Sequence, residues 1–295
     1  MRWKRPLITL GLLVTFVGGY LFAEKAAELY LWQAFESGSY IYDVLFETLT
    51  WVLPATIAGG LFFGAIHAAY SDPEPTIREG LVRRHEAFGA FFEHWAATVG
   101  MLFLIGSGVL LGFLFVPRFV STTETVGLTI NVHWAGAAIL LFAASYHLGG
   151  LIMGDHREIL PKSGDLKNAV RNVASYLRLG NEPEAEKYLP IQRVSYLIWA
   201  GLIAVVAITG LVKAADYPWE VGGGLMSAMT YLHDIFALFT ILFLVAHVGA
   251  VLMPSHLQQL RSQITGWIPI EYVRSHHSRW LPEQTGSNKS KSGGD

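Results

Sequence analysis

Histidine dominates the residues of this sequence that could do chemistry. The chain of 295 residues has 11 histidines and no cysteine. A sequence without cysteine cannot form disulfides, ligate iron–sulfur clusters, build thiolate zinc sites or attach a c-type haem through a CxxCH motif. Any redox centre held by this chain must therefore depend on histidine, methionine or non-covalent contacts.

Five histidines lie in or at the ends of long apolar stretches, where an ionisable side chain is costly and usually functional. His133 and His147 are 14 residues apart, and His233 and His247 repeat that spacing. Fourteen residues of α-helix return a side chain to within about 40° of its starting direction and advance it by about 21 Å. Each pair therefore faces one side of its helix at two depths. The fifth histidine is His94.

Histidines at two matched depths are the ligands that two stacked haem b groups need. A haem iron takes two axial ligands, and imidazole suits it well. We expect His133 and His233 to bind one haem, the outer haem, toward the outer membrane surface. We expect His247 to bind a second haem, the inner haem, toward the inner surface, with either His94 or His147. The alternative is that all five are interfacial or helix-packing residues bonded to backbone carbonyls.

Long apolar helices must position these histidines. The chain is 52% hydrophobic and only 15% charged, with a mean hydropathy of +0.39, whereas a soluble domain carries about 25% charged residues. Small residues in these stretches would admit a neighbouring helix or a flat macrocycle: Gly100, Gly106, Gly108, Gly112, Gly136, Gly201 and Gly210. About 20 apolar residues cross a bilayer, and the sequence has six such stretches, at Pro6–Ala23, Thr48–Ser71, Trp95–Pro117, Thr125–Gly154, Val194–Val212 and within Val221–Gln259. The predicted fold is an all-α integral membrane protein.

The distribution of basic residues predicts how the spans are oriented. With six spans and a cytoplasmic N-terminus, only Lys25, Arg118 and Lys213 of the 21 lysines and arginines lie outside, and the other 18 lie inside. Cytoplasmic loops carry such an excess of positive charge. We therefore expect a multi-pass protein with both termini in the cytoplasm, and an uncleaved first span, although a signal peptide is the alternative there.

The last four apolar stretches resemble the cytochrome b (gamma) subunit of membrane-bound formate dehydrogenase and its hydrogenase and thiosulfate-reductase relatives. The resemblance covers about residues 83–282. The motifs that carry it are His94-Trp95, Asn131-Val132-His133-Trp134-Ala135-Gly136, Lys187-Tyr188-Leu189-Pro190-Ile191-Gln192-Arg193, Tyr231-Leu232-His233 with His247, and His276-His277-Ser278-Arg279-Trp280. It implies a four-helix bundle with two haem b groups, in which His94 is the partner of His247.

The resemblance also implies a quinone pocket near the inner haem. The family pattern places an asparagine and a glutamine there, and this sequence keeps Gln192 but has Leu189 at the asparagine position. Gln192, Arg193 and Tyr188 are therefore the candidate quinone-binding residues, since an amide can donate to a carbonyl and arginine can stabilise negative charge. The alternative is that they anchor the helix end among lipid headgroups.

The function implied by the resemblance is electron transfer in a prokaryotic cytoplasmic membrane. Electrons would pass from an iron–sulfur partner subunit, itself bound to a catalytic subunit, through two haems to (mena)quinone. Quinone reduction would be the chain's own half-reaction, and a net charge of −2 suggests no nucleic-acid partner. The alternatives are a hydrogenase or sulfur-compound reductase cytochrome with the same or reversed electron flow, and a haem-free transporter or scaffold.

The sequence divides into three parts under this interpretation. Residues 1–82 form a two-helix membrane extension that the family pattern lacks, and residues 83–282 form the four-helix di-haem domain. Residues 283–295 are rich in glycine and serine and are predicted to be a disordered tail.

Overall fold

The structure is a computed structural model that describes Gly11, Val17 and residues 45–71, 76–85, 87–154 and 157–281. In this part of the chain, five helices are long and apolar enough to cross a membrane: α4 (Val52–Tyr70), α5 (Phe92–Leu111), α6 (Thr123–Met153), α8 (Pro190–Ala215) and α9 (Gly223–Val251). They confirm the predicted all-α membrane class. Apart from Gly11 and Val17, the predicted first span lies outside the described residues, as does the tail 283–295.

Local sequence signals start and stop these helices. Thr122 caps α6 because its hydroxyl accepts a hydrogen bond from the Thr125 amide at 3.2 Å, and α6 ends where Gly154 takes a left-handed conformation at φ 102°. Helix α8 begins with Pro190, and the Gln192 side chain accepts from the Leu189 amide at 2.9 Å. A proline in the first position and a side-chain cap three residues on are typical helix starts.

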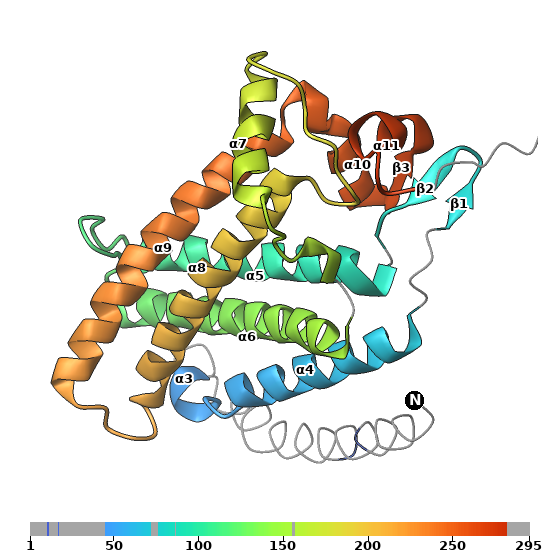
Figure 1. Cartoon of the computed structure of the whole chain (residues 1–295). Helices are drawn as coiled ribbons and strands as arrows, with labels where there is room; N and C mark the ends of the chain where they lie inside the picture. The colour runs from blue at the N-terminus through green and yellow to red at the C-terminus, as the bar shows by residue number, and fades with distance from the viewer. Residues whose placement is uncertain are drawn as a thin grey trace, which may run out of the picture.

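The five long helices form two groups (Figure 1). Helix α6 packs against both α4 and α5, and the α8–α9 hairpin crosses this layer. Small residues allow the close packing inside the layer. A Cβ on Gly64 of α4 would lie 1.9 Å from the Tyr146 carbonyl oxygen of α6, and one on Gly136 of α6 would lie 2.9 Å from the Gly100 carbonyl oxygen of α5. Such contacts are how small residues bring membrane helices together.

The helical bundle has two ends that differ in structure. At one end the two hairpins close, through residues 112–122 between α5 and α6 and residues 216–222 between α8 and α9. We call this the hairpin end. The other end, where α5 and α8 begin and α6 and α9 finish, carries the smaller elements: α7 (Asp165–Tyr176), α10 (Leu257–Thr265), α11 (Ile270–His276) and a short sheet. We call this the cap end.

The sheet at the cap end was not predicted from the sequence. Strands β1 (Ile77–Arg78), β2 (Leu81–Arg83) and β3 (Trp267–Pro269) pair antiparallel in that order, with Val82 opposite both Ile77 and Ile268. Val82, Ile268 and Val273 are fully buried and form its core. The segment before α5 is thus fixed to the segment after α9. Strands of two or three residues are too short to give a periodic signal.

The remaining short elements connect the long helices. They are α3 (Leu45–Thr48), the π-helical turn η2 (Ala87–Phe91) that leads into α5, and the 3-10 turns η3 (Arg157–Ile159) and η4 (Pro254–His256).

Candidate functional site

Two histidines from different hairpins face each other near the hairpin end. His133 lies on α6 and His233 on α9, and their ring centroids are 6.3 Å apart with the ring planes inclined at 58°. The structure therefore brings together the two residues that the sequence analysis assigned to one haem.

A cavity of about 410 Å³ surrounds this pair. It lies between α5, α6, α8 and α9, and its volume is in the range of ligand sites. Its walls are mainly apolar, with a few polar groups toward the hairpin end. Lining residues include Met101, Leu104, Gly108, Ile130, Ala137, Val206, Gly210, Lys213, Asp234 and Thr240.

Each of the two rings is held by a hydroxyl from a neighbouring helix. Ser107 Oγ of α5 is 2.9 Å from His133 Nδ1, and Thr209 Oγ1 of α8 is 3.0 Å from His233 Nδ1. Both hydroxyl residues are buried, with 3% of their surface exposed. Metal-binding histidines almost always have their second ring nitrogen hydrogen-bonded in this way.

A glycine follows each of the two hydroxyl residues and leaves room for the ring. A Cβ on Gly108 would lie 3.8 Å from His133 Cε1, and a Cβ on Gly210 would lie 3.2 Å from His233 Cε1. The two glycines therefore border the histidines directly, unlike Gly100 and Gly136, which serve helix packing.

The geometry of this pair fits a haem. An imidazole–metal bond is about 2 Å long, so two rings on opposite sides of one metal place their centroids about 6 Å apart. The observed separation is 6.3 Å. An apolar cavity suits the macrocycle, and Lys213 on the cavity wall suits a haem carboxylate as a charge partner.

The other three candidate ligands lie toward the cap end. The His94 ring on α5 and the His247 ring on α9 are near enough to interact electrostatically. His94 Nδ1 is buried and has no hydrogen-bond partner among the described residues. The His247 ring packs edge-on against Trp199 of α8, with centroids 6.0 Å apart.

His147 has a different environment. Its Nδ1 is 2.8 Å from Glu93 Oε2, and its Nε2 is 3.0 Å from the Tyr196 hydroxyl. Both ring nitrogens are therefore engaged by side chains of α5 and α8. A ligand must present a free nitrogen to the metal, so this arrangement favours His94 over His147 as the partner of His247.

Of the candidate quinone residues, Gln192 is part of a polar chain at the cap end. Its Nε2 donates to Gln259 Oε1 at 2.7 Å, and its Oε1 accepts from Arg84 at 3.4 Å as well as from the Leu189 amide. Arg84 is 5% exposed, and burial lowers its pKa. Arg84 also lies over the Tyr188 ring, 5.9 Å from its centroid.

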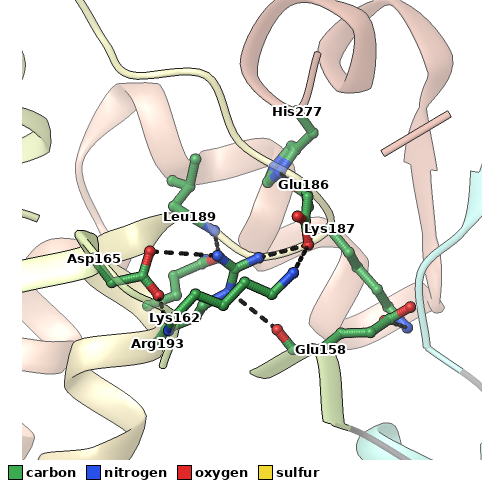
Figure 2. A network of polar contacts seen from close by, with 9 residues as sticks. Glu158, Lys162, Asp165, Glu186, Lys187, Leu189, Arg193 and His277 are labelled. Atoms are coloured by element: carbon green, nitrogen blue, oxygen red, sulfur yellow. Dashed lines mark hydrogen bonds and ion pairs between the residues drawn. The ribbon is translucent and has the colours of Figure 1, made fainter. Parts of the chain in front are cut away.

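Arg193 points the other way, toward α7 (Figure 2). Its guanidinium is 3.4 Å from Asp165 and 2.9 Å from Glu186, and it donates to the Glu158 carbonyl at 3.0 Å. Its side chain is 5% exposed. A hydrogen bond from Lys162 lowers the pKa of Glu186, and Arg193 adds to the effect. Arg193 therefore joins α8 to α7 and the segment before it.

Several residues of these sites were missed from the sequence. Ser107 and Thr209 were not identified, although the repeated order of hydroxyl residue and glycine in Ser107-Gly108 and Thr209-Gly210 is a usable signal. Glu93 was not identified either, although it directly precedes His94 in the sequence. Tyr196 was also missed, because nothing local in the sequence indicates that it meets His147.

The family model described as prokaryotic cytochrome b561 matches residues 84–266, which is more than half of the chain. No curated protein and no solved structure matches.

Proposed function

The chain belongs to the prokaryotic cytochrome b561 family, and we propose that it is the membrane cytochrome b subunit of a respiratory oxidoreductase. The family makes it a haem b-binding membrane protein in electron transfer. Our proposal is that it passes electrons from an iron–sulfur partner subunit to a quinone, as the gamma subunit of formate dehydrogenase does. A partner is required because a chain without cysteine cannot ligate its own iron–sulfur relay.

The observation that carries this proposal is the facing pair His133 and His233. The two rings come from separate hairpins and meet across an apolar cavity at a separation that suits two axial ligands. Haem b supplies one-electron chemistry when it is bound. His133 and His233 would hold the haem iron, and the mainly apolar walls of the cavity would limit the access of water, which tunes a redox potential.

We place a second haem between His94 and His247. His94 has a free Nδ1 among the described residues, and the two rings lie on the helices α5 and α9 near the cap end. One haem near each end of the bundle would give electrons a path along it. The number of haems per chain is therefore part of the test.

The test is a pyridine haemochrome assay and a visible spectrum of the purified full chain. We expect two b-type haems per chain. One haem would contradict the stacked arrangement, and none would support the haem-free transporter or scaffold. Identification of co-purified subunits would distinguish a formate dehydrogenase from a hydrogenase or a sulfur-compound reductase, in which the electron flow could also be reversed.

We propose that quinone is reduced at the cap end, near Gln192, Arg193 and Tyr188. Gln192 lies at the start of α8, at the end of the bundle that holds His94 and His247. Its amide is bonded to Gln259 in this structure, so binding a quinone carbonyl requires exchange of that bond. Arg193 is committed to Asp165 and Glu186, which makes Gln192 the leading candidate.

Gln192→Leu should slow quinone reduction while both haems stay bound and reducible by the partner. Gln259→Leu is the matched control, because it removes the same side-chain hydrogen bond but leaves the Gln192 amide free to donate. If Gln192 binds quinone, only Gln192→Leu raises KM for a soluble quinone analogue. Equal effects of the two variants, or none, would assign Gln192 to the structural network alone.

A further inference from the structure

We propose that Ser107 and Thr209 are positioning residues that set the tautomer and the orientation of His133 and His233. The inference rests on the proposed function in one respect, which is that these two histidines bind a haem. The resemblance to the formate dehydrogenase subunit implies no role for these two hydroxyl groups.

The direction of each hydrogen bond follows from the number of protons available. Ser107 Oγ lies 2.6 Å from the Phe103 carbonyl oxygen, and Thr209 Oγ1 lies 2.7 Å from the Val205 carbonyl oxygen. Two oxygens at that distance need a hydrogen between them, and a carbonyl carries none. Each hydroxyl therefore donates its only hydrogen to its own helix.

The hydroxyl oxygens can then only accept from the histidines. The hydrogen between Ser107 Oγ and His133 Nδ1 must belong to the ring, and the same holds for Thr209 Oγ1 and His233 Nδ1. A neutral imidazole carries one hydrogen. Nε2 of both rings is therefore left with a free lone pair, which is the form that binds a metal.

The arrangement occurs twice, which argues against coincidence. The hydroxyl residue and the glycine after it lie on the first helix of one hairpin at Ser107-Gly108 and on the first helix of the other at Thr209-Gly210. In both hairpins the histidine comes from the second helix. The hydroxyl fixes one ring nitrogen, and the glycine provides space beside Cε1.

Loss of the hydroxyl should change the iron's electronic properties as well as the fit of the ring. Accepting a hydrogen bond from Nδ1–H raises the basicity of the ligand, and a more basic ligand favours the ferric state. Removing the acceptor should therefore raise the midpoint potential of one haem. Outer-sphere partners typically alter affinity or activity by 10–100-fold. A tenfold change in the reduction equilibrium is 59 mV for one electron.

The experiment is potentiometric titration of both haems in the full chain with Ser107→Ala or Thr209→Val. We expect the potential of one haem to rise in each variant while the other is unchanged, or that haem alone to be lost. Ser107→Thr and Thr209→Ser keep the acceptor and should restore the original values.

Thr129→Val is the matched control. Thr129 of α6 is not among the residues that line the cavity, is 7% exposed, and donates to its own Thr125 carbonyl at 2.6 Å, but it makes no histidine contact among the described residues. Its variant should leave both potentials unchanged. Unchanged potentials in Ser107→Ala and Thr209→Val, or an equal shift in Thr129→Val, would overturn the inference even if the unmodified protein reduces quinone. A shift in a protein that lacks quinone reduction would instead refute the proposed function and leave the inference intact.

Discussion

The two ends of the bundle hold histidines in different ways. Near the hairpin end, His133 and His233 are equivalent: each has one nitrogen bonded to a buried hydroxyl, and the two rings face each other. Near the cap end there are three histidines, and His147 is bonded at both nitrogens to Glu93 and Tyr196. One end is symmetric, and the other is not.

The difference arises at a single position that corresponds in the two hairpins, α5–α6 and α8–α9. His94 precedes Ser107 by 13 residues, and Tyr196 precedes Thr209 by the same number. Tyr196 therefore occupies in α8 the place that His94 occupies in α5. The pair formed by His94 and His247 thus corresponds to the pair formed by Tyr196 and His147. Because this position holds tyrosine in α8, the second pair is joined by a hydrogen bond between Tyr196 and His147 and does not offer two histidine ligands.

The largest expected effect is loss of a haem from the symmetric end. His233→Ala should remove one of two haems and leave the other, because the His94–His247 pair shares no ligand with it. His133→Ala should have the same effect. Haem content per folded chain measures this. Loss of both haems from a folded protein would show that the two ends are not independent.

Replacing each candidate ligand at the cap end tests which histidine binds the haem there. His94→Ala should remove the haem there, whereas His147→Ala should retain both, because His147 already uses both nitrogens on Glu93 and Tyr196. The same haem assay reports the result. If His147→Ala removes the haem and His94→Ala does not, the assignment of His94 as the partner of His247 is wrong.

A smaller effect should distinguish the two glycines at the symmetric end. In Gly210→Ala the new methyl would lie 3.2 Å from His233 Cε1, so the ring must move by a few tenths of an ångström, whereas in Gly108→Ala the corresponding 3.8 Å is an ordinary contact. We expect Gly210→Ala to change the haem spectrum and lower haem retention, and Gly108→Ala to resemble the unmodified protein. Identical spectra for both variants would mean that Gly210 serves only helix packing.

The smallest effect concerns the stability of the cap end. Burial and the Arg84 charge lower the pKa of His277 to about 3, and its Nδ1 donates to the Glu186 carbonyl at 2.7 Å. The unfolded value is about 6.5, so the unfolded state binds more protons as the pH falls below it. The contribution of His277 to the free energy of unfolding is therefore fully present above about pH 6.5 and is lost as the pH falls toward 3.

The unfolding midpoint in detergent should therefore fall between about pH 7 and about pH 5, and less so in His277→Gln. Limited proteolysis should locate the change in residues 257–281. Equal pH dependence in the two proteins would exclude His277 as its cause.

The sequence predicted those features that are encoded locally. Apolar length gave the described spans, and the 14-residue spacing placed His133 with His147, and His233 with His247, on one face of a helix. Whether His94 or His147 meets His247 depends on how the two hairpins cross, which no spacing within one helix reveals. Ser107 and Thr209 were missed because hydroxyls in apolar helices usually only bond to their own backbone. Gln192 was assigned to quinone from a motif, while its local role at the start of α8 is to cap the helix.

The three-stranded sheet at the cap end also sets an order of biosynthesis. β1 and β2 leave the ribosome before α5, but β3 is made only after α9, so the sheet closes when every described span has been synthesised. Until then, Val82 lacks Ile268 as a neighbour and the outer edge of β2 is unpaired. An unpaired edge is prone to pairing with other chains. β3 is therefore added to the sheet only after the described spans, and its docking requires that all of them have been synthesised.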